Sequence, residues 1–189
     1  MSTLSELLGG GGGGAFTYIS SISMSNSSAV DFTSLPLGTY DNFFIIGTGI
    51  GTSNDYENIL ARMFRNGSLS TGGNYLAGRI LAGFTNQLAY QSTYTNYWNI
   101  YSYGSRTNAK GTFQLWLTNM NDAEPRNFNG YSQFYQGYGA NPDSSTMTQQ
   151  STNLICGNTG SGSFDGFRLY VSSGTFVSGE IHLYGFKTS

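Results

Sequence analysis

The chain has 189 residues, a length that suits one domain able to bury roughly 70% of the surface of its unfolded form. Its formal net charge is −2, and its eight Lys and Arg residues form no basic stripe, so we expect no nucleic-acid binding. The composition is rich in Gly (27), Tyr (14) and Phe (13) and only 10% charged, which favours an all-β sandwich or barrel. The single cysteine, Cys156, excludes an intramolecular disulfide and a cysteine-rich metal site.

Residues 1–14 are predicted to form a separate arm. Thr3-Leu4-Ser5-Glu6 has the spacing of a helix capping box, and three leucines share one face of the turn that it starts. These leucines are Leu4, Leu7 and Leu8. Gly9 to Gly14 form a flexible tether with an r.m.s. reach of roughly 13 Å. Two interpretations stay open: a frayed terminus, or a docking peptide that orders only against a partner or a neighbouring copy.

The arm does not resemble a targeting segment. No Lys or Arg precedes Arg62, and the apolar part of the arm is short, so we expect neither a secretory signal nor insertion into a membrane. The sequence therefore predicts a protein that is made in a cytoplasm.

The domain proper is predicted to span 15–189 and to begin with strands. Apolar and polar residues alternate from Phe16 to Met24, but Ile19 breaks the alternation, which indicates a bulge or a second buried face. A turn at Asn26-Ser27-Ser28 leads to a short strand over Ala29 to Thr33.

Three further strands are clear in the central part of the chain. Phe43 to Ile46 is apolar on both faces, which predicts a central strand that is covered on both sides. Ile59 to Arg65 is followed by Asn66-Gly67, a strong hairpin signal, and its partner is expected to begin near Asn74-Tyr75. Thr112 to Thr118 alternates, with Phe113, Leu115 and Leu117 predicted to face the core.

The last two dozen residues contain two alternating runs joined by a short loop with Gly174 and Gly179. We predict two neighbouring antiparallel strands, with Phe167, Leu169, Val171, Ile181 and Leu183 facing the core. On that prediction Arg168, Tyr170, His182 and Tyr184 share the opposite surface. In all, about nine short strands with regular turn signals predict a jelly-roll-like two-sheet antiparallel β-sandwich, in which the two chain ends pair in one sheet.

The residues that carry enzyme chemistry are scarce. The only histidine, His182, has no second histidine to complete a zinc site, and no short Ser, His and Asp signature accompanies it. A glycan-cleaving enzyme needs two opposed carboxylates, for which only Asp41, Asp55 and Glu57 are candidates. Gly47 to Gly51 lacks the lysine of a phosphate loop, and we interpret it as turn chemistry. We therefore expect a protein that is not an enzyme, with no cofactor and no metal.

The informative surplus is aromatic. Six aromatic residues between 90 and 103 are set among small polar side chains, where they can stack on sugar rings or form a protein interface. They are Tyr90, Tyr94, Tyr97, Trp98, Tyr101 and Tyr103.

Both ends of the domain resemble small jelly-roll modules of tailed bacteriophages, especially marine and cyanobacterial phages. The closing pattern stands here as Gly166-Phe167-Arg168-Leu169-Tyr170, then Ser172-Ser173-Gly174, then Leu183-Tyr184-Gly185-Phe186-Lys187. The opening pattern stands as Tyr18 to Ile22 and Asn26 to Leu35, and the Leu-rich start with a glycine tract is similar as well. Phe167 and Phe186 replace the usual aliphatic residues, and residues 74–150 match poorly.

The resemblance implies a virion structural protein and carries over no catalytic residue. We expect it to decorate the capsid or to form a short fibre, anchored to other virion proteins by its arm and assembled as a homo-oligomer, with a trimer favoured. The alternative is a carbohydrate- or receptor-binding tail-fibre module that recognises a host surface glycan.

Overall fold

The computed structural model describes residues 16–54, 57–72, 75–82, 87–91, 96–105, 110–122, 129–136, 148–156 and 163–187. In this part of the chain all regular structure is β-strand. The strands are β1 (Thr17–Ser23), β2 (Ala29–Phe32), β3 (Asn42–Thr52), β4 (Glu57–Arg65), β5 (Ser68–Leu69), β6 (Tyr75–Ala82), β7 (Gln87–Gln91), β8 (Trp98–Ser105), β9 (Gly111–Thr118), β10 (Asn129–Gln136), β11 (Thr148–Cys156), β12 (Phe164–Val171) and β13 (Phe176–Phe186).

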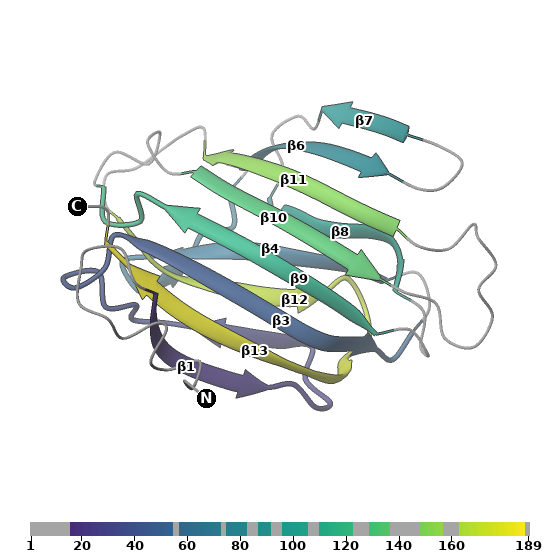
Figure 1. Ribbon diagram of the computed structural model, residues 1–189, viewed down its shortest axis with the longest axis horizontal. Coiled ribbons are helices and arrows are strands. Elements are labelled where there is room, and N and C mark those ends of the chain that lie inside the picture. Colours follow the sequence, from purple (N-terminus) through teal and green to yellow (C-terminus); the bar gives the residue numbers. More distant parts are fainter. Residues whose placement is uncertain are drawn as a thin grey trace, which may run out of the picture.

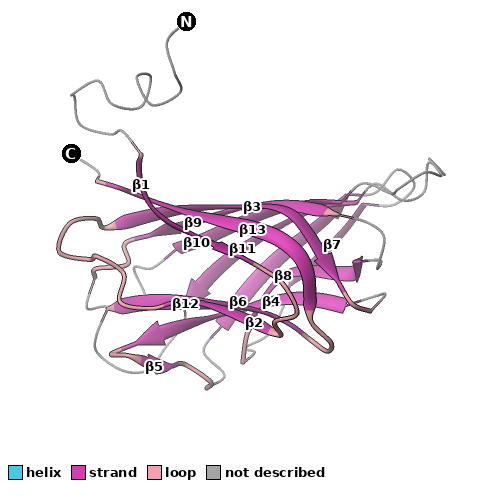
Figure 2. Ribbon diagram, turned by 90° about the horizontal axis from the view of Figure 1, so that it is seen from below, coloured by secondary structure: helices cyan, strands magenta, loops and turns pink. Residues whose placement is uncertain are grey.

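The strands form two layers (Figure 2). The large sheet has the order β1-β13-β3-β9-β10-β11-β6-β7, and Figure 1 looks onto its outer face. The small sheet has the order β2-β12-β4-β5, with β8 also paired to β4. Every pairing between these strands is antiparallel, so the predicted all-β sandwich of two antiparallel sheets is confirmed.

The strand pairing is that of a jelly roll, in which the chain can be described as one long hairpin that is rolled into two sheets. The first strand pairs with the last (β1 with β13), and the second pairs with the last but one (β2 with β12). Further in, β3 pairs with β9 and β4 pairs with β8. The remaining long strands, β10, β11, β6 and β7, extend the large sheet beyond β9.

The core lies between the two sheets and is filled by alternate residues of each strand. The large sheet contributes residues such as Phe43, Ile45, Phe113, Leu115, Leu117, Ile181 and Leu183. The small sheet contributes residues such as Phe32, Ile59, Met63, Phe167 and Leu169, with the Phe32 and Phe167 rings stacked 4.9 Å apart. The inward faces predicted from the period of two at Phe113, Leu115 and Leu117 and in the last two runs are therefore confirmed.

Two local predictions are confirmed in detail. The register between β1 and β13 shifts between Tyr18 and Ser20, which places a bulge at Ile19. Asn66 and Gly67 have φ values of 50° and 72°, the positive angles that a tight hairpin turn requires at both central positions.

The predicted pairing of the last two strands is wrong. β12 lies in the small sheet and β13 in the large sheet, so residues 172–175 cross from one layer to the other. The period of two shows which residues face a core but not which strand lies alongside, and two strands that face the same core from opposite layers give the same pattern. Arg168 and Tyr170 therefore lie on one outer face of the sandwich, and His182 and Tyr184 lie on the other.

The predicted hairpin partner of β4 is also wrong. β4 pairs with β5 directly after the turn, whereas Tyr75 begins β6 in the large sheet. The Tyr75 side chain still returns to β4, because its hydroxyl accepts a hydrogen bond from the Met63 amide at 2.9 Å and donates one to the Ser70 carbonyl at 3.0 Å. Both ends of this link are enclosed in the core, so Tyr75 joins the two sheets.

Two predictions about β3 need correction. Phe44 and Ile46 are half-buried on the outer face of the large sheet, so this strand is fully covered on its inner side only. Residues 47–51 are part of β3 and do not form a connecting turn; the strand bulges there, with a register shift between Gly47 and Ile50 and a φ of 64° at Gly49.

Candidate interaction surface

The outer face of the large sheet carries a cluster of six aromatic side chains, which we call the aromatic face. Its members are Phe16, Tyr18, Phe44, Trp116, Tyr184 and Phe186. Four of them form one row across four neighbouring strands, because Tyr18 pairs with Tyr184, Tyr184 with Phe44, and Phe44 with Trp116. Residues directly opposite one another on a sheet face are in contact distance, so the register itself builds the row.

The rings of the aromatic face touch along this row. The Phe44 and Trp116 centroids are 4.2 Å apart, those of Phe44 and Tyr184 are 6.4 Å apart, and those of Tyr18 and Tyr184 are 5.8 Å apart. These are the separations at which aromatic pairs attract beyond their area burial. The row is therefore a preorganised surface and not four independent side chains.

Phe16 and Phe186 complete the cluster at one side of the row. The Phe16 ring lies 5.3 Å from Phe44, 5.7 Å from Trp116 and 5.1 Å from Phe186. Phe16 directly precedes β1, so the chain enters the first strand from within the aromatic face.

The aromatic face stays partly open among the described residues. Tyr18 is 54% exposed, and the other five members are half-buried. The adjacent register row consists of Ser21, His182, Ile46 and Gln114. His182 Nε2 lies 3.6 Å from Glu180 Oε2, and the other three residues of the row are uncharged, so the aromatic face borders a strip with few charged groups.

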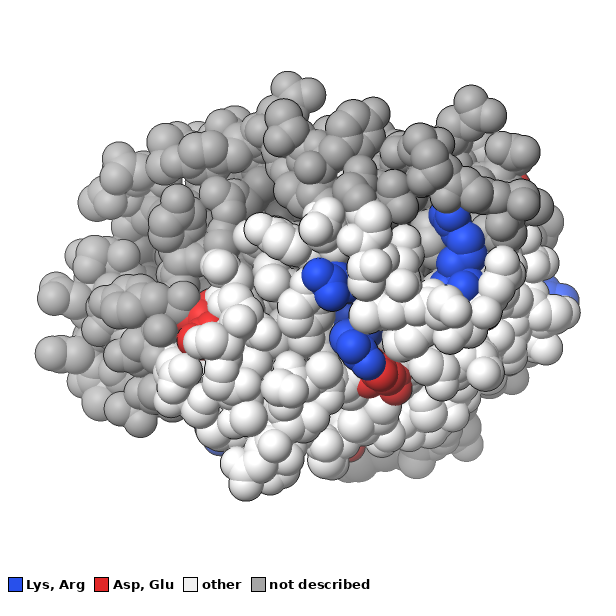
Figure 3. All heavy atoms as spheres, turned by 180° about the vertical axis from the view of Figure 1, so that it is seen from behind, with Lys and Arg blue, Asp and Glu red and all other residues white. Residues whose placement is uncertain are grey.

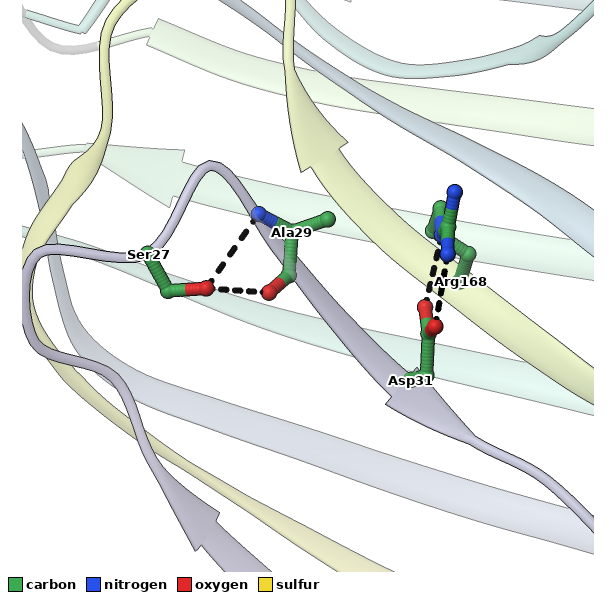
Figure 4. Close-up of polar contacts among 4 residues, drawn as sticks. All are labelled: Ser27, Ala29, Asp31 and Arg168. Atoms are coloured by element: carbon green, nitrogen blue, oxygen red, sulfur yellow. Dashed lines mark hydrogen bonds and ion pairs between the residues drawn. The ribbon is translucent and has the colours of Figure 1, made fainter.

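The outer face of the small sheet has a different chemistry. Arg168 on β12 lies between Asp31 on β2 and Arg62 on β4 in one register row, which we call the arginine row. The Arg168 guanidinium donates two hydrogen bonds of 2.7 Å to the two Asp31 oxygens (Figure 4). This bidentate pair raises the pKa of Arg168 above its ordinary value, chiefly through the hydrogen bonds from Arg168 to Asp31.

Aromatic rings support the arginines on this face. The Arg62 guanidinium lies 5.1 Å from the Tyr170 ring centroid, and the Arg168 guanidinium lies 5.8 Å from that of Phe64. Arg62 Nε also donates a 2.8 Å hydrogen bond to the Asn96 carbonyl. Figure 3 shows basic side chains gathered on this face, with acidic atoms against one of them. The row contains two arginines and one carboxylate, which pairs with Arg168, so it has an excess positive charge.

The Tyr170 side chain is half-buried in this surface. Its hydroxyl is enclosed and has no hydrogen-bond partner among the described residues, and burial raises the pKa of Tyr170 above its ordinary value. The tyrosine therefore stays neutral near pH 7 and serves as a ring beneath Arg62.

The carboxylates considered for catalysis do not form a pair in the described residues. Asp55 lies outside them, and the Glu57 carboxylate is buried and accepts hydrogen bonds from the hydroxyls of Ser172 and Ser173, the Ser173 amide and Asn54. Burial raises the pKa of Glu57, but the hydrogen bonds together outweigh it, and the net pKa is lowered. An ionised carboxylate surrounded by donors is a structural clamp between β4 and the β12–β13 connection.

The predicted aromatic site from 90 to 103 is only partly described. Trp98 is 1% exposed and belongs to the core, so its ring offers no surface to a sugar. Tyr97 is 36% exposed, next to the Asn96 carbonyl that binds Arg62. Tyr94 lies outside the described residues, as do Leu4, Leu7 and Leu8, and only the backbone is described for Tyr90, Tyr101 and Tyr103.

The aromatic face was not predicted from the sequence, because its members come from four separate segments of the chain. A signal does exist in the sequence: Phe44 and Trp116 each stand at the out-of-phase position of a strand whose other positions already supply the core. Large aromatic residues at such positions indicate an outer surface that is covered or that recognises something.

Among the described residues no group of three or more His, Cys, Asp or Glu side chains is placed to hold a metal ion. The same part of the chain contains no helix that is long and apolar enough to cross a membrane. Compared with known proteins, the chain matches no protein-family model and no curated protein sequence.

Proposed function

We propose that this chain is a non-enzymatic structural protein of a tailed-phage particle, located in the virion, where it decorates the capsid or forms a short appendage. The observation that supports this most is the aromatic face: six aromatic side chains in mutual contact on the outside of a sheet whose inner side already fills the core. The resemblance of both chain ends to phage jelly-roll modules supplies the setting.

Aromatic side chains suit a surface for assembly. They supply large contact area at a small cost in conformational entropy, and they are enriched at protein interfaces where charged residues are depleted. The four-strand row contains no charged side chain, and the chain as a whole has only 10% charged residues. A second protein surface can therefore cover the row without desolvating an ion.

The proposal assigns the arm the role of an anchor to other virion proteins, through Leu4, Leu7 and Leu8. Because Phe16 belongs to the aromatic face, the arm is attached to the domain at this face. Arm and face can then contribute to one continuous contact with the particle, and copies on a repeated lattice form a homo-oligomer.

The test is incorporation into particles. Phage that carry Phe44→Ser with Trp116→Ser are expected to contain far fewer copies of this protein per virion, measured by mass spectrometry against the major capsid protein. The matched control is Gln114→Ser, which changes the neighbouring register row of the same face. Undiminished incorporation of a folded double variant would refute an assembly role for the aromatic face. In the wild type, a copy number near that of the capsid protein indicates head decoration, and a far smaller one indicates an appendage.

A second candidate function, recognition of a host surface glycan, is favoured by the arginine row. Arg62 and Arg168 with Asp31, and the exposed Tyr97 ring nearby, combine an excess cation with an aromatic surface, which suits an acidic saccharide. Binding of purified acidic host polysaccharide should be lost in Arg62→Ala and kept in Arg62→Lys at low salt. Equal binding by the wild type and Arg62→Ala, or no binding by either, would exclude this function for the row.

A further inference from the structure

The N-terminal arm begins on the aromatic face. Phe16 is in ring contact with Phe44, Trp116 and Phe186 at centroid distances of 5.1 to 5.7 Å. The 15 residues that precede Phe16 are therefore joined to the domain at a partly open apolar surface. This starting point is independent of any role of the protein in a virion.

The length of the tether matches the size of the surface. For six consecutive glycines, Gly9 to Gly14, random-coil scaling predicts an r.m.s. reach of roughly 13 Å. The aromatic row spans β1, β13, β3 and β9, that is, three strand spacings or roughly 14 Å. The residues that precede the tether can therefore be placed over any member of the row, including Trp116 on β9.

The side chains of the arm are also chemically complementary to the aromatic face. Its leucines, Leu4, Leu7 and Leu8, supply the branched apolar side chains that pack between partly open rings, whereas its only side-chain charge is Glu6. The exposed Lys187 follows directly after Phe186, at the edge of the aromatic face, and is of opposite sign to Glu6. The face offers no carboxylate against which Glu6 would be repelled.

We propose that in the free protein the arm folds back onto its own domain and seats Leu4, Leu7 and Leu8 on the aromatic face. A short flexible tether holds a segment at an effective concentration in the millimolar range. At micromolar protein concentrations the chain's own arm therefore occupies the face ahead of the arm of another copy. The arm thus shields the aromatic face until a stronger partner displaces it; only this consequence rests on the proposed function.

The indole signals of the two tryptophans in a ¹H–¹⁵N NMR spectrum test the proposal. Trp116 lies on the aromatic face, so its signal reports whether the arm is bound there. Trp98 lies in the core at 1% exposure, so its signal reports whether the domain is folded. Their signals are assigned with Trp116→Phe. In the full chain, Leu4→Ser, Leu7→Ser and Leu8→Ser together are expected to shift the Trp116 signal and leave the Trp98 signal in place. Ser5→Ala is the matched control within the arm and should shift neither.

Addition of a peptide of residues 1–14 to the triple-serine variant should return the Trp116 signal to its wild-type position in a saturable way, and only at peptide concentrations in the millimolar range. A Trp116 signal that is identical in the wild type and the triple variant would overturn the proposal. A wild-type signal that changes with protein concentration would also overturn it, because the arm would then bind a neighbouring copy. Neither result depends on incorporation into a virion, so the two proposals fail separately.

Discussion

Glu57 offers the sharpest test of how the two sheets are held together. The substitution Glu57→Gln keeps the shape of the side chain but removes the charge of a carboxylate that four donors surround. The donors are the Ser172 hydroxyl at 2.5 Å, the Ser173 amide at 2.7 Å, the Ser173 hydroxyl and the Asn54 amide at 3.3 Å. Since Ser172 and Ser173 lie where the chain crosses between the sheets, the substitution acts on that crossing.

The expected loss of stability follows from the number of hydrogen bonds that the carboxylate accepts. A hydrogen bond to a charged group contributes about 1.5–3 kcal/mol and a neutral one about 1 kcal/mol. The single carbonyl oxygen of glutamine can accept about two of the four bonds, and the serine hydroxyls can rotate to accept from its amide. We therefore expect Glu57→Gln to lower the free energy of unfolding by about 2 kcal/mol. For a domain of this size that corresponds to a fall in Tm of about 4–8 °C.

The effect of Glu57→Gln should depend on pH. The folded state lowers the pKa of Glu57, so the ionised carboxylate stabilises the fold fully at neutral pH, above the ordinary glutamate pKa of about 4.3. This contribution is lost as the pH falls through the lowered pKa of the folded state. The difference in stability between the wild type and Glu57→Gln should therefore be largest near pH 7 and shrink below about pH 4.

Thermal unfolding followed by circular dichroism at pH 7 and at acidic pH measures both effects. Glu180→Gln is the control. The Glu180 side chain is exposed and makes a long contact of 3.6 Å with His182, so this substitution should change the free energy of unfolding by less than about 0.5 kcal/mol. Equal Tm values for the wild type and Glu57→Gln at pH 7 would show that the four hydrogen bonds do not stabilise the crossing. A difference that stays constant at acidic pH would refute the lowered pKa.

Three further experiments probe the core and the small sheet. Gly47→Ala places a methyl group 2.1 Å from the Phe113 ring and should cost about 3 kcal/mol in urea unfolding; an unchanged midpoint would contradict the close packing. Phe167→Ala empties a fully buried site and should cost about 3–5 kcal/mol by the same assay, and a cost below about 1 kcal/mol would argue against its place in the core. Asp31→Ala, combined with Arg168→Ala in a double-mutant cycle, should give a coupling of about 0.5–1 kcal/mol that weakens with added salt; a salt-independent coupling would exclude an ion pair.

Most of the fold could be predicted from local patterns. The alternation in 112–118, the bulge at Ile19 and the turn at Asn66-Gly67 depend on residues that are near one another in the sequence, and all three are confirmed. The pairing of β12 and β13 could not be predicted in the same way. A connection of four residues permits both a hairpin and a crossing between layers, and the choice depends on strands far away, β2 and β4 on one side and β1 and β3 on the other.

The candidate surface was harder to predict than the fold. The segment from 90 to 103 is conspicuous because its six aromatic residues lie close together in the sequence, yet its tryptophan, Trp98, is enclosed in the core. The aromatic face combines Phe16, Phe44, Trp116 and Phe186, which are separated by up to 170 residues and meet only through the order of strands in the large sheet. Strand order is a property of the whole chain, so composition signalled an aromatic surplus without locating it.

The two outer faces also require different chemistry of a binding partner. On the small sheet, Arg168 is already held by Asp31 in a bidentate pair, and Arg62 donates to a backbone carbonyl, so a ligand must offer an anion that competes with existing hydrogen bonds. On the large sheet, the rings contact one another and carry no charge, and the Tyr18 hydroxyl donates a 3.2 Å hydrogen bond to Ser21 Oγ. Each part of their open area that a partner covers contributes about 25 cal/mol per Å² with no opposing desolvation of an ion. Affinity on the aromatic face therefore grows with contact area and resists salt, whereas binding to the arginine row weakens as salt is added. The salt dependence of binding to any identified partner consequently distinguishes which face is engaged.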